Sequence, residues 1–139
     1  MDGCIFCMIA SGEIPSEAVL ETEDVRVVAD ISPANPGHLL VIPKRHADDF
    51  TKLDEASAVA VIKTAQRVVR AMNNTLHPDG INVLQNNGEA AGQTVRHYHM
   101  HLIPRYVGDT VRMSWVPTAP GSEAIHSAAA EIRAGLGEA

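Results

Sequence analysis

The segment His97-Tyr98-His99-Met100-His101-Leu102-Ile103 alternates imidazoles with apolar side chains. Successive side chains of a β-strand point to opposite faces, so this pattern predicts a strand whose three histidines form a row, about 7 Å apart. Tyr98, Met100 and Leu102 would then point into a hydrophobic core. The segment therefore predicts a sheet with a hydrophobic core on one face and a row of imidazoles on the other.

Three histidines on one face allow three interpretations. They could chelate zinc, with His-x-His and a third histidine completing a catalytic metal site. One of them could attack as a nucleophile while its neighbours orient it or transfer protons. They could also be exposed surface residues, although packing rarely requires such a row. The preceding loop, residues 86–94, offers amides, a hydroxyl and backbone N–H groups that suit phosphate oxygens, which favours nucleophilic chemistry.

The rest of the chain predicts a mixture of short strands and one long helix. Residues 54–73 form the main helix, because apolar residues recur there at three- and four-residue spacing. The stripe consists of Val59, Ile62, Gln66, Val69 and Met72, widened by Val61, Ala65 and Val68. Shorter helices are predicted at 4–10 and 122–136, and strands at 18–21, 25–30, 38–42, 80–85 and 96–103, the last ended by Pro104. Short connections favour antiparallel pairing, so the predicted fold class is α+β, with helices packed on one antiparallel sheet.

Composition limits the classes of partner. A chain of 139 residues is expected to form one domain, and its net charge of −6 argues against a broad nucleic-acid surface. No apolar run reaches the length of a membrane span, and Met1-Asp2-Gly3-Cys4 has no basic region, so we expect a cytoplasmic protein without a membrane partner. Cys4 and Cys7 form a Cys-x-x-Cys pair, which in a reducing compartment indicates a metal site or a redox pair.

Three sequence blocks together resemble the histidine triad (HIT) family. The first is Gly92-Gln93-Thr94-Val95-Arg96 followed by the histidine segment, which is similar to the family signature His-φ-His-φ-His-φ-φ, where φ is apolar. The second is Asp30-Ile31-Ser32-Pro33 with the run from Gly37 to His46, and the third is Cys4-Ile5-Phe6-Cys7 with Ile9 and Ile14-Pro15. The resemblance covers about residues 4 to 107. It implies a nucleotide-binding hydrolase or transferase.

The resemblance implies a role for each catalytic position. His99 matches the histidine that attacks the α-phosphate and forms a nucleotidyl-histidine, and His101 matches the one that contacts the scissile phosphate. Asn86 corresponds to a residue that hydrogen-bonds near the bridging atom, and Thr94 to one that contacts phosphate or the leaving group. His38 matches a buried histidine that supports the triad from behind.

Two further sets of residues follow from the same resemblance. Asp30 matches the carboxylate that holds both ribose hydroxyls, a favourable bidentate arrangement. The remaining expected nucleotide-binding residues are Ile5, Phe6, Ile9, Val28 and Ile31 around the base, with Gly92 and Gln93 in the loop. Bacterial-type members with a Cys-x-x-Cys pair bind a structural zinc, and the corresponding ligands here are Cys4, Cys7, His46 and His97. No cofactor is expected to take part in the chemistry itself.

The resemblance leaves the substrate open. His101 in place of glutamine argues against a hexose-phosphate uridylyltransferase, while Asn86 resembles the phosphoramidate-cleaving Hint branch. Thr94 and Ile103-Pro104-Arg105 look more like the dinucleoside polyphosphate hydrolases. The substrate is therefore expected to be a purine nucleoside phosphoramidate or a dinucleoside polyphosphate, and the alternative is a nucleotide- or partner-binding module with negligible turnover. The family implies a homodimer with a ten-stranded sheet, and it assigns no role to the C-terminal extension, residues 108–139, of the single domain 1–139.

Overall fold

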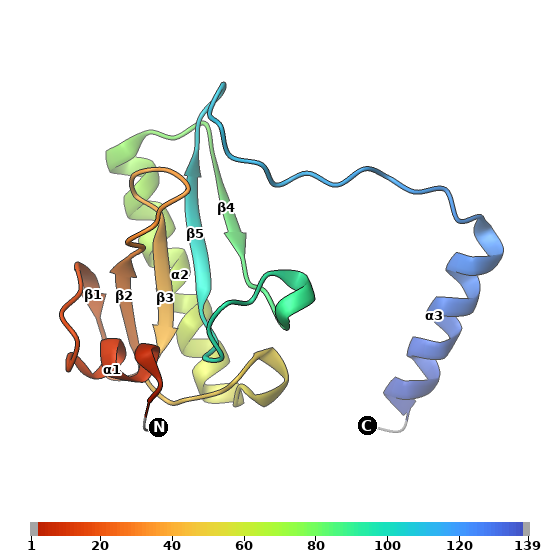
Figure 1. Cartoon of the computed structure of the whole chain (residues 1–139), viewed down its shortest axis with the longest axis horizontal. Helices are drawn as coiled ribbons and strands as arrows, with labels where there is room; N and C mark the ends of the chain where they lie inside the picture. The colour runs from red at the N-terminus through yellow and green to blue at the C-terminus, as the bar shows by residue number, and fades with distance from the viewer. Residues whose placement is uncertain (1–2, 138–139) are drawn as a thin grey trace.

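The computed structural model describes residues 3–137; residues 1–2 and 138–139, the ends of the expected domain, lie outside the described residues. Its centre is an antiparallel sheet of five strands in the order β1-β2-β3-β5-β4 (Figure 1). The strands are β1 (Ala18–Glu21), β2 (Val25–Ala29), β3 (Leu39–Pro43), β4 (Gly80–Leu84) and β5 (Met100–Arg105). The predicted α+β class and five-stranded antiparallel sheet are thereby confirmed.

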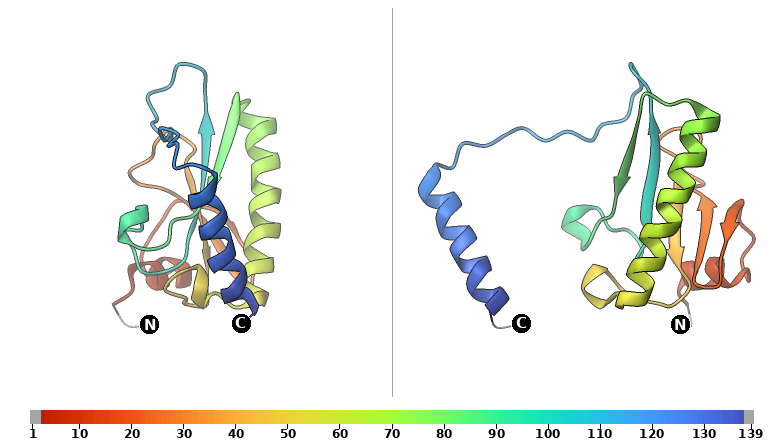
Figure 2. Two further views of the ribbon diagram at one scale, coloured as in Figure 1. Left: turned by 90° about the vertical axis from the view of Figure 1, so that its right-hand side faces the viewer. Right: turned by 180° about the vertical axis from the view of Figure 1, so that it is seen from behind.

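The long helix α2 (Glu55–Leu76) covers one face of this sheet (Figure 2). It begins after Asp54, whose carboxylate accepts the backbone N–H of Ser57 and so caps the helix. Its buried residues are Ser57, Val61, Thr64, Ala65, Val68 and Met72. The predicted stripe was therefore partly wrong: Val59 and Ile62 are exposed, and the residues expected only to widen the stripe make the core contact.

The opposite face of the sheet carries the short helix α1 (Ile5–Ser11). Cys4 caps its first turn by accepting the Cys7 N–H, and Gly12 ends it in the left-handed conformation, with φ of 83°. Phe6 and Ala10 pack here against a second apolar cluster formed with Val28, Leu40 and Ile42. Alternate residues of β3 thus serve two cores, since Leu39 and Val41 face α2.

The histidine segment enters the sheet later than predicted. Strand β5 begins at Met100, the residue that pairs with Val41 of β3, whereas the preceding Tyr98 N–H donates outside the sheet, to the carbonyl oxygen of Ala47. Pro104, expected to end the strand, lies within it. β3 pairs with β5 only as far as Leu102. Pro104 therefore has no β3 residue opposite it, and the N–H that proline lacks is not needed for pairing there. The predicted alternation holds, since Tyr98, Met100 and Leu102 are all buried on the α2 side.

The C-terminal part of the chain leaves the domain. Residues 112–121 run away from the sheet past β4, and helix α3 (Ser122–Gly137) stands apart at their end (Figure 1). We call residues 111–137 the C-terminal arm. Among residues 3–137, no helix combines the length and apolar character needed to cross a membrane.

Candidate functional site

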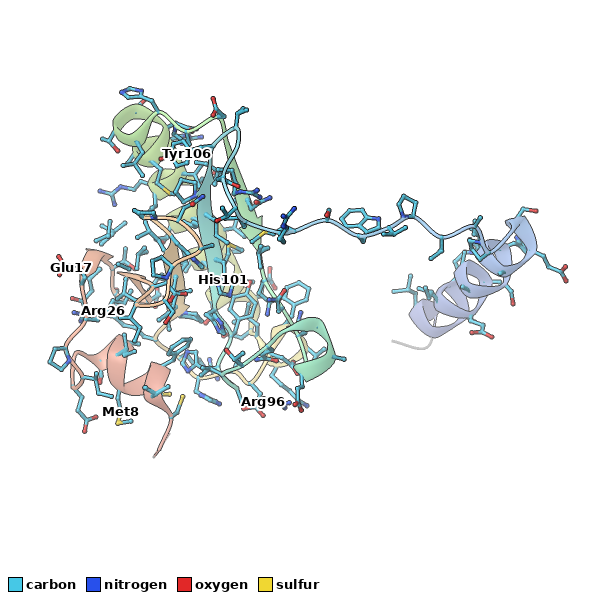
Figure 3. All side chains as sticks on the ribbon, turned by 45° about the horizontal axis from the view of Figure 1, so that its top comes forward. Met8, Glu17, Arg26, Arg96, His101 and Tyr106 are labelled. Atoms are coloured by element: carbon cyan, nitrogen blue, oxygen red, sulfur yellow. The ribbon has the colours of Figure 1, made fainter. Side chains whose placement is uncertain are left out.

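The three histidines of the segment do not share one site. His99 and His101 lie side by side, with ring centroids 5.0 Å apart, whereas the ring of His97 lies 4.9 Å from that of His46. Figure 3 shows His101 at the centre of the folded domain on β5. The predicted row therefore divides into a pair that lines a cavity and one residue that joins the cysteine cluster.

His99 and His101 open into a cavity of about 420 Å³ between α1 and the sheet. Most of the expected nucleotide-binding residues line it, together with Thr94 from the expected catalytic set: Ile5, Phe6, Ile9, Val28, Asp30 and Ile31. The wall is largely apolar, and the ring of Phe6 meets that of His99 edge-on at 4.8 Å. A mostly apolar cavity with a few convergent polar groups is typical of a small-molecule site.

The hydrogen bonds assign a proton to one nitrogen of His99. Nδ1 of His99 lies 2.7 Å from the backbone carbonyl oxygen of His97, which can only accept, so Nδ1 carries the hydrogen. Nε2 is then left with its lone pair. Burial lowers the pKa of His99 from its ordinary value, which favours the neutral, nucleophilic ring.

A second chain of hydrogen bonds fixes His38 and His101. The Ala34 N–H donates to Nδ1 of His38 at 2.9 Å, so in neutral His38 the hydrogen sits on Nε2. That Nε2 lies 2.9 Å from Nδ1 of His101, which must therefore accept. The hydrogen of neutral His101 is left on Nε2, where it can be donated to a ligand. Burial, with smaller effects from His99 and His38, lowers the pKa of His101 to about 4, so the ring is neutral at pH 7.

Asp30 lies at the end of β2, beside this pair. Its Oδ1 accepts the Ser32 N–H at 2.8 Å, and its Oδ2 lies 3.5 Å from Nε2 of His38. Asp30, His38 and His101 are close enough together to hold a metal ion. The proton on Nε2 of His38 argues against one, because a metal ligand needs a lone pair there.

Gly92 and Gln93, expected in the nucleotide-binding loop, do not line this cavity, whereas Thr94 of the same loop does. Gln93 is buried and its side-chain amide is fully engaged by backbone groups, accepting from the Gly88 N–H and donating to the carbonyl oxygens of Asp48 and Val95. Gly92, with φ of 97°, is held against the Asn86 side chain, where an added Cβ would lie 3.3 Å from Asn86 Nδ2. Neither Gln93, Gly92, Asn86 nor His38 lines the cavity. These residues shape the loops around the site in this structure.

The predicted site residues did not include two polar residues of the cavity wall, Ser16 and Ser32. The hydroxyl oxygen of Ser16 is buried without a hydrogen-bond partner among the described residues. A buried hydroxyl without a partner is costly, so it is available to a ligand. Its neighbours Ile14 and Pro15, which also line the cavity, were noted only as part of a motif.

Cys4, Cys7, His46 and His97 form a compact cluster at the base of α1. One ligand atom from each lies within 4.8 Å of the others, and Nδ1 of His97 is 3.4 Å from both sulfurs and 3.2 Å from Nδ1 of His46. Ligand atoms around a tetrahedral zinc ion are about 3.4 to 3.7 Å apart. The cluster is therefore close enough to hold a metal.

Both histidines of this cluster are oriented for metal binding. Nε2 of His97 lies 2.8 Å from the carbonyl oxygen of Pro43, and Nε2 of His46 lies 2.8 Å from the Asp48 carboxylate. Oxygen acceptors at Nε2 fix the proton there and leave the Nδ1 lone pair free to face the cluster. This is the usual arrangement around ligating histidines.

Comparison with known proteins agrees with this geometry. Protein hit of Bacillus subtilis is 44% identical over 115 residues, spanning 82% of this chain and 79% of that protein. The adenosine 5'-monophosphoramidase hnt1 of Schizosaccharomyces pombe is 41% identical over 102 residues, spanning 73% of this chain and 74% of that protein.

Solved structures show the same fold. SMU.412c of Streptococcus mutans superposes with a TM-score of 0.92 at 38% identity, covering 98% of this chain and 87% of that one. A HIT family protein of Bacillus anthracis gives 0.88 at 39% identity, covering 96% and 97%. A zinc-bound histidine triad family protein of Mycobacterium smegmatis gives 0.75 at 36%, covering 96% and 97%. The profile of the HIT domain matches residues 11–108, and this chain belongs to the HIT domain family.

Proposed function

We propose that this chain is a nucleotide hydrolase that cleaves the bond between the α-phosphorus of a purine nucleotide and its leaving group. The leaving group is the amine of a phosphoramidate or the nucleoside phosphate of a dinucleoside polyphosphate. The observation that carries the proposal is the hydrogen bond from Nδ1 of His99 to the His97 carbonyl oxygen. In the neutral ring this bond leaves the lone pair on Nε2, where it can attack phosphorus. A relative named adenosine 5'-monophosphoramidase supports the choice of substrate class.

The reaction takes place in two displacements. In the first, the Nε2 lone pair of His99 forms a bond to the α-phosphorus, and the leaving group departs with the electron pair of its bond and takes up a proton. In the second, water attacks the phosphorus, the P–N bond returns its electron pair to Nε2, and water loses a proton. Two displacements lower each barrier relative to one direct attack. Nε2–H of His101 and the Thr94 hydroxyl donate to the phosphate oxygens as charge develops.

The residues of the cavity wall bind the nucleoside part of the substrate. The Asp30 carboxylate, one oxygen of which already accepts from Ser32, holds the ribose hydroxyls in a charge-assisted arrangement. The base lies between the apolar residues of α1 and β2, led by Phe6 and Val28. The unpartnered Ser16 hydroxyl offers a polar contact to the nucleoside.

The cysteine–histidine cluster holds a structural zinc ion in this proposal. Two thiolates and two imidazoles close the coordination shell, so no position remains for substrate. The ion ties α1, which covers the base, to the loop that precedes β5. A zinc-bound relative of the same fold supports this assignment.

The proposed assembly is a homodimer joined along β4. This strand lies at the edge of the sheet and pairs only with β5, so its outer N–H and C=O groups face outward. Val83 on β4 and Ile62 on α2 are each 52% exposed, on the same side of the sheet. An unprotected edge beside exposed apolar side chains is typical of a pairing surface.

Turnover of adenosine 5'-phosphoramidate and of diadenosine polyphosphates by the purified protein tests the function. We expect release of adenosine monophosphate, loss of activity in His99→Ala, and unchanged activity in His77→Ala, which alters an exposed histidine outside the cavity. Mass spectrometry of a rapidly quenched mixture should find a nucleotidyl adduct on His99. Activity retained in His99→Ala would refute the mechanism, and tight nucleotide binding without turnover would favour the alternative of a binding module.

A further inference from the structure

Ser16 lies in the connection between α1 and β1, opposite the carboxylate proposed to hold the ribose (Figure 1). The Ala29 N–H donates to the carbonyl oxygen of Glu17 at 2.9 Å, which continues the antiparallel pairing of β1 with β2. One step further, the same register places Ser16 opposite Asp30, with their Cβ atoms about 5 Å apart on one face of the sheet. Both residues line the cavity of the candidate site.

The Ser16 hydroxyl is not held by the protein. Its oxygen is buried and has no hydrogen-bond partner within residues 3–137. Such a group has lost its bonds to water without replacing them, which costs stability. Because no bond fixes the side chain, rotation about χ1 moves the hydroxyl between staggered positions. The hydroxyl can therefore turn toward a ligand in the cavity without breaking a hydrogen bond within the protein.

The other polar side chains of the cavity wall have partners in the proposed function. Asp30 is assigned to the ribose, and the two histidines and Thr94 are assigned to the phosphate. Ser32 is exposed, and its backbone N–H already donates to Asp30. The rest of the wall is apolar. Among the side chains of the wall, the Ser16 hydroxyl is thus the one that remains to hydrogen-bond the base.

We propose that the Ser16 hydroxyl donates a hydrogen bond to N3 of the purine base. The inference rests on the proposed function, in which Asp30 binds the ribose hydroxyls. In a purine nucleoside, N3 is the ring acceptor on the sugar edge of the base, the edge next to the ribose 2'-hydroxyl. With the ribose hydroxyls on Asp30, that edge faces the opposite residue, Ser16. Adenine and guanine both carry N3, so the contact recognises the two bases alike.

Equilibrium binding of adenosine monophosphate (AMP), the product of the proposed reaction, tests the contact without turnover. 3-Deaza-AMP has C–H in place of N3, and the wild type should bind it about 3- to 10-fold more weakly than AMP, the loss of one hydrogen bond. Ser16→Ala should bind AMP more weakly by a similar factor and should no longer distinguish AMP from 3-deaza-AMP. Calorimetric titration at pH 8, where both bases are uncharged, measures the four dissociation constants.

Matched controls locate the contact on the protein and on the base. Ser11→Ala removes an exposed hydroxyl outside the cavity, which donates to the Met8 carbonyl oxygen, and should leave all affinities unchanged. 7-Deaza-AMP retains N3, so Ser16→Ala should weaken its binding as it weakens that of AMP. Equal affinity of the wild type for AMP and 3-deaza-AMP would overturn the proposal. So would an effect of Ser16→Ala that disappears with 2'-deoxy-AMP instead, since the hydroxyl would then bind the ribose.

Thermal denaturation separates a ligand contact from a structural role. Ser16→Ala removes a buried hydroxyl that lacks a partner, so the free variant should melt at or above the temperature of the wild type. AMP should then raise its melting temperature less than that of the wild type. A lower melting temperature of the free variant would show that Ser16 stabilises the fold and would overturn the proposal. Failure of the wild type to bind AMP would contradict the proposed function itself, whereas equal binding of AMP by both proteins would contradict only the Ser16 contact.

Discussion

Nδ1 of His99 lies 2.7 Å from the backbone carbonyl oxygen of His97, so a residue of the cysteine–histidine cluster fixes the position of the proton on the proposed nucleophile. His97 is itself oriented by the carbonyl of Pro43 at the end of β3. The proposed zinc ion would hold the His97 side chain and, through it, the backbone oxygen that orients His99. The proposed zinc site and the proposed nucleophile are thus connected through two residues of one short segment.

Removal of the metal should therefore weaken both stability and turnover. A strong chelator is expected to lower the melting temperature, because losing a ligand held at about a thousand times its dissociation constant costs about 4 kcal/mol. kcat should fall more than KM changes, since His99 loses its orientation while the base and ribose contacts remain. Thermal denaturation and steady-state kinetics with and without chelator measure both effects. Cys7→Ser is the control, because its properties should no longer respond to chelator; an unchanged melting temperature of the wild type would contradict the zinc assignment.

The sequence predicts local elements well where local chemistry defines them. Gly12 ends α1 and Asp54 caps α2 as their residue types indicate, and the strands fall within a few residues of the predicted ranges. The start of β5 was missed because it depends on a distant partner, the Ala47 carbonyl that binds the Tyr98 N–H. Periodicity identified α2 but not which of two adjacent apolar stripes faces the sheet. That choice depends on how the helix lies across the strands.

The family resemblance predicted most of the candidate site, including the four residues of the cysteine–histidine cluster and most of the residues that line the cavity around His99. It could not show that backbone groups satisfy the Gln93 amide, because one partner, the Asp48 carbonyl oxygen, is brought near only by the fold. It also gave no sign that Ser16 would be buried without a partner. The start of the arm depends on a hydrogen bond from Asn35 to Asp109, two residues that lie 74 positions apart in the sequence.

Replacing the proposed ribose carboxylate should change substrate selection. Asp30→Asn is expected to raise KM for a ribonucleotide substrate about 10- to 100-fold, the equivalent of one or two charge-assisted hydrogen bonds. A substrate with a 2',3'-dideoxyribose should show little change, because it lacks the hydroxyls that Asp30 would hold. Asp24→Asn, the same change at an exposed position outside the cavity, is the matched control. Equal losses on both substrates would show that Asp30 has another role.

His38 is expected to act as a positioning residue through the N–H that it presents to His101. His38→Gln keeps an amide N–H near the position of Nε2, whereas His38→Leu leaves Nδ1 of His101 without its donor. The leucine variant should lose about 10- to 100-fold in kcat at similar KM, and the glutamine variant should recover most of that loss. Measuring kcat and KM of both variants with the same substrate tests this role. Equal activity of the two variants would contradict a role for this hydrogen bond.

A charge on the outer face of α2 should separate the proposed dimer. Ile62→Glu places a carboxylate at an exposed apolar position of α2 within the proposed dimer surface, and burying an unpaired charge is costly, so the dimer should dissociate. Arg67→Glu lies on the other exposed flank of α2 and should leave association unchanged. Sedimentation velocity over a range of concentrations measures the difference. A dimer in both variants would place the association surface elsewhere. A monomeric wild type would contradict the proposed dimer.

Neutral, buried His101 should make the protein sensitive to acid. Its pKa falls from 6.5 to about 4 in the folded state, so between these values the unfolded chain binds a proton that the folded chain does not. The free energy of unfolding is therefore complete above pH 6.5, declines as pH falls, and has lost at most about 3 kcal/mol below pH 4. His101→Asn removes this proton while keeping an acceptor for His38, so its decline should be shallower. Urea unfolding of both proteins between pH 7.5 and 4.5 measures the free energy of unfolding of each. Protonation of the cysteine–histidine cluster affects both proteins equally, so it cancels in the difference between them. Identical slopes would mean that His101 is protonated equally in the folded and unfolded chains.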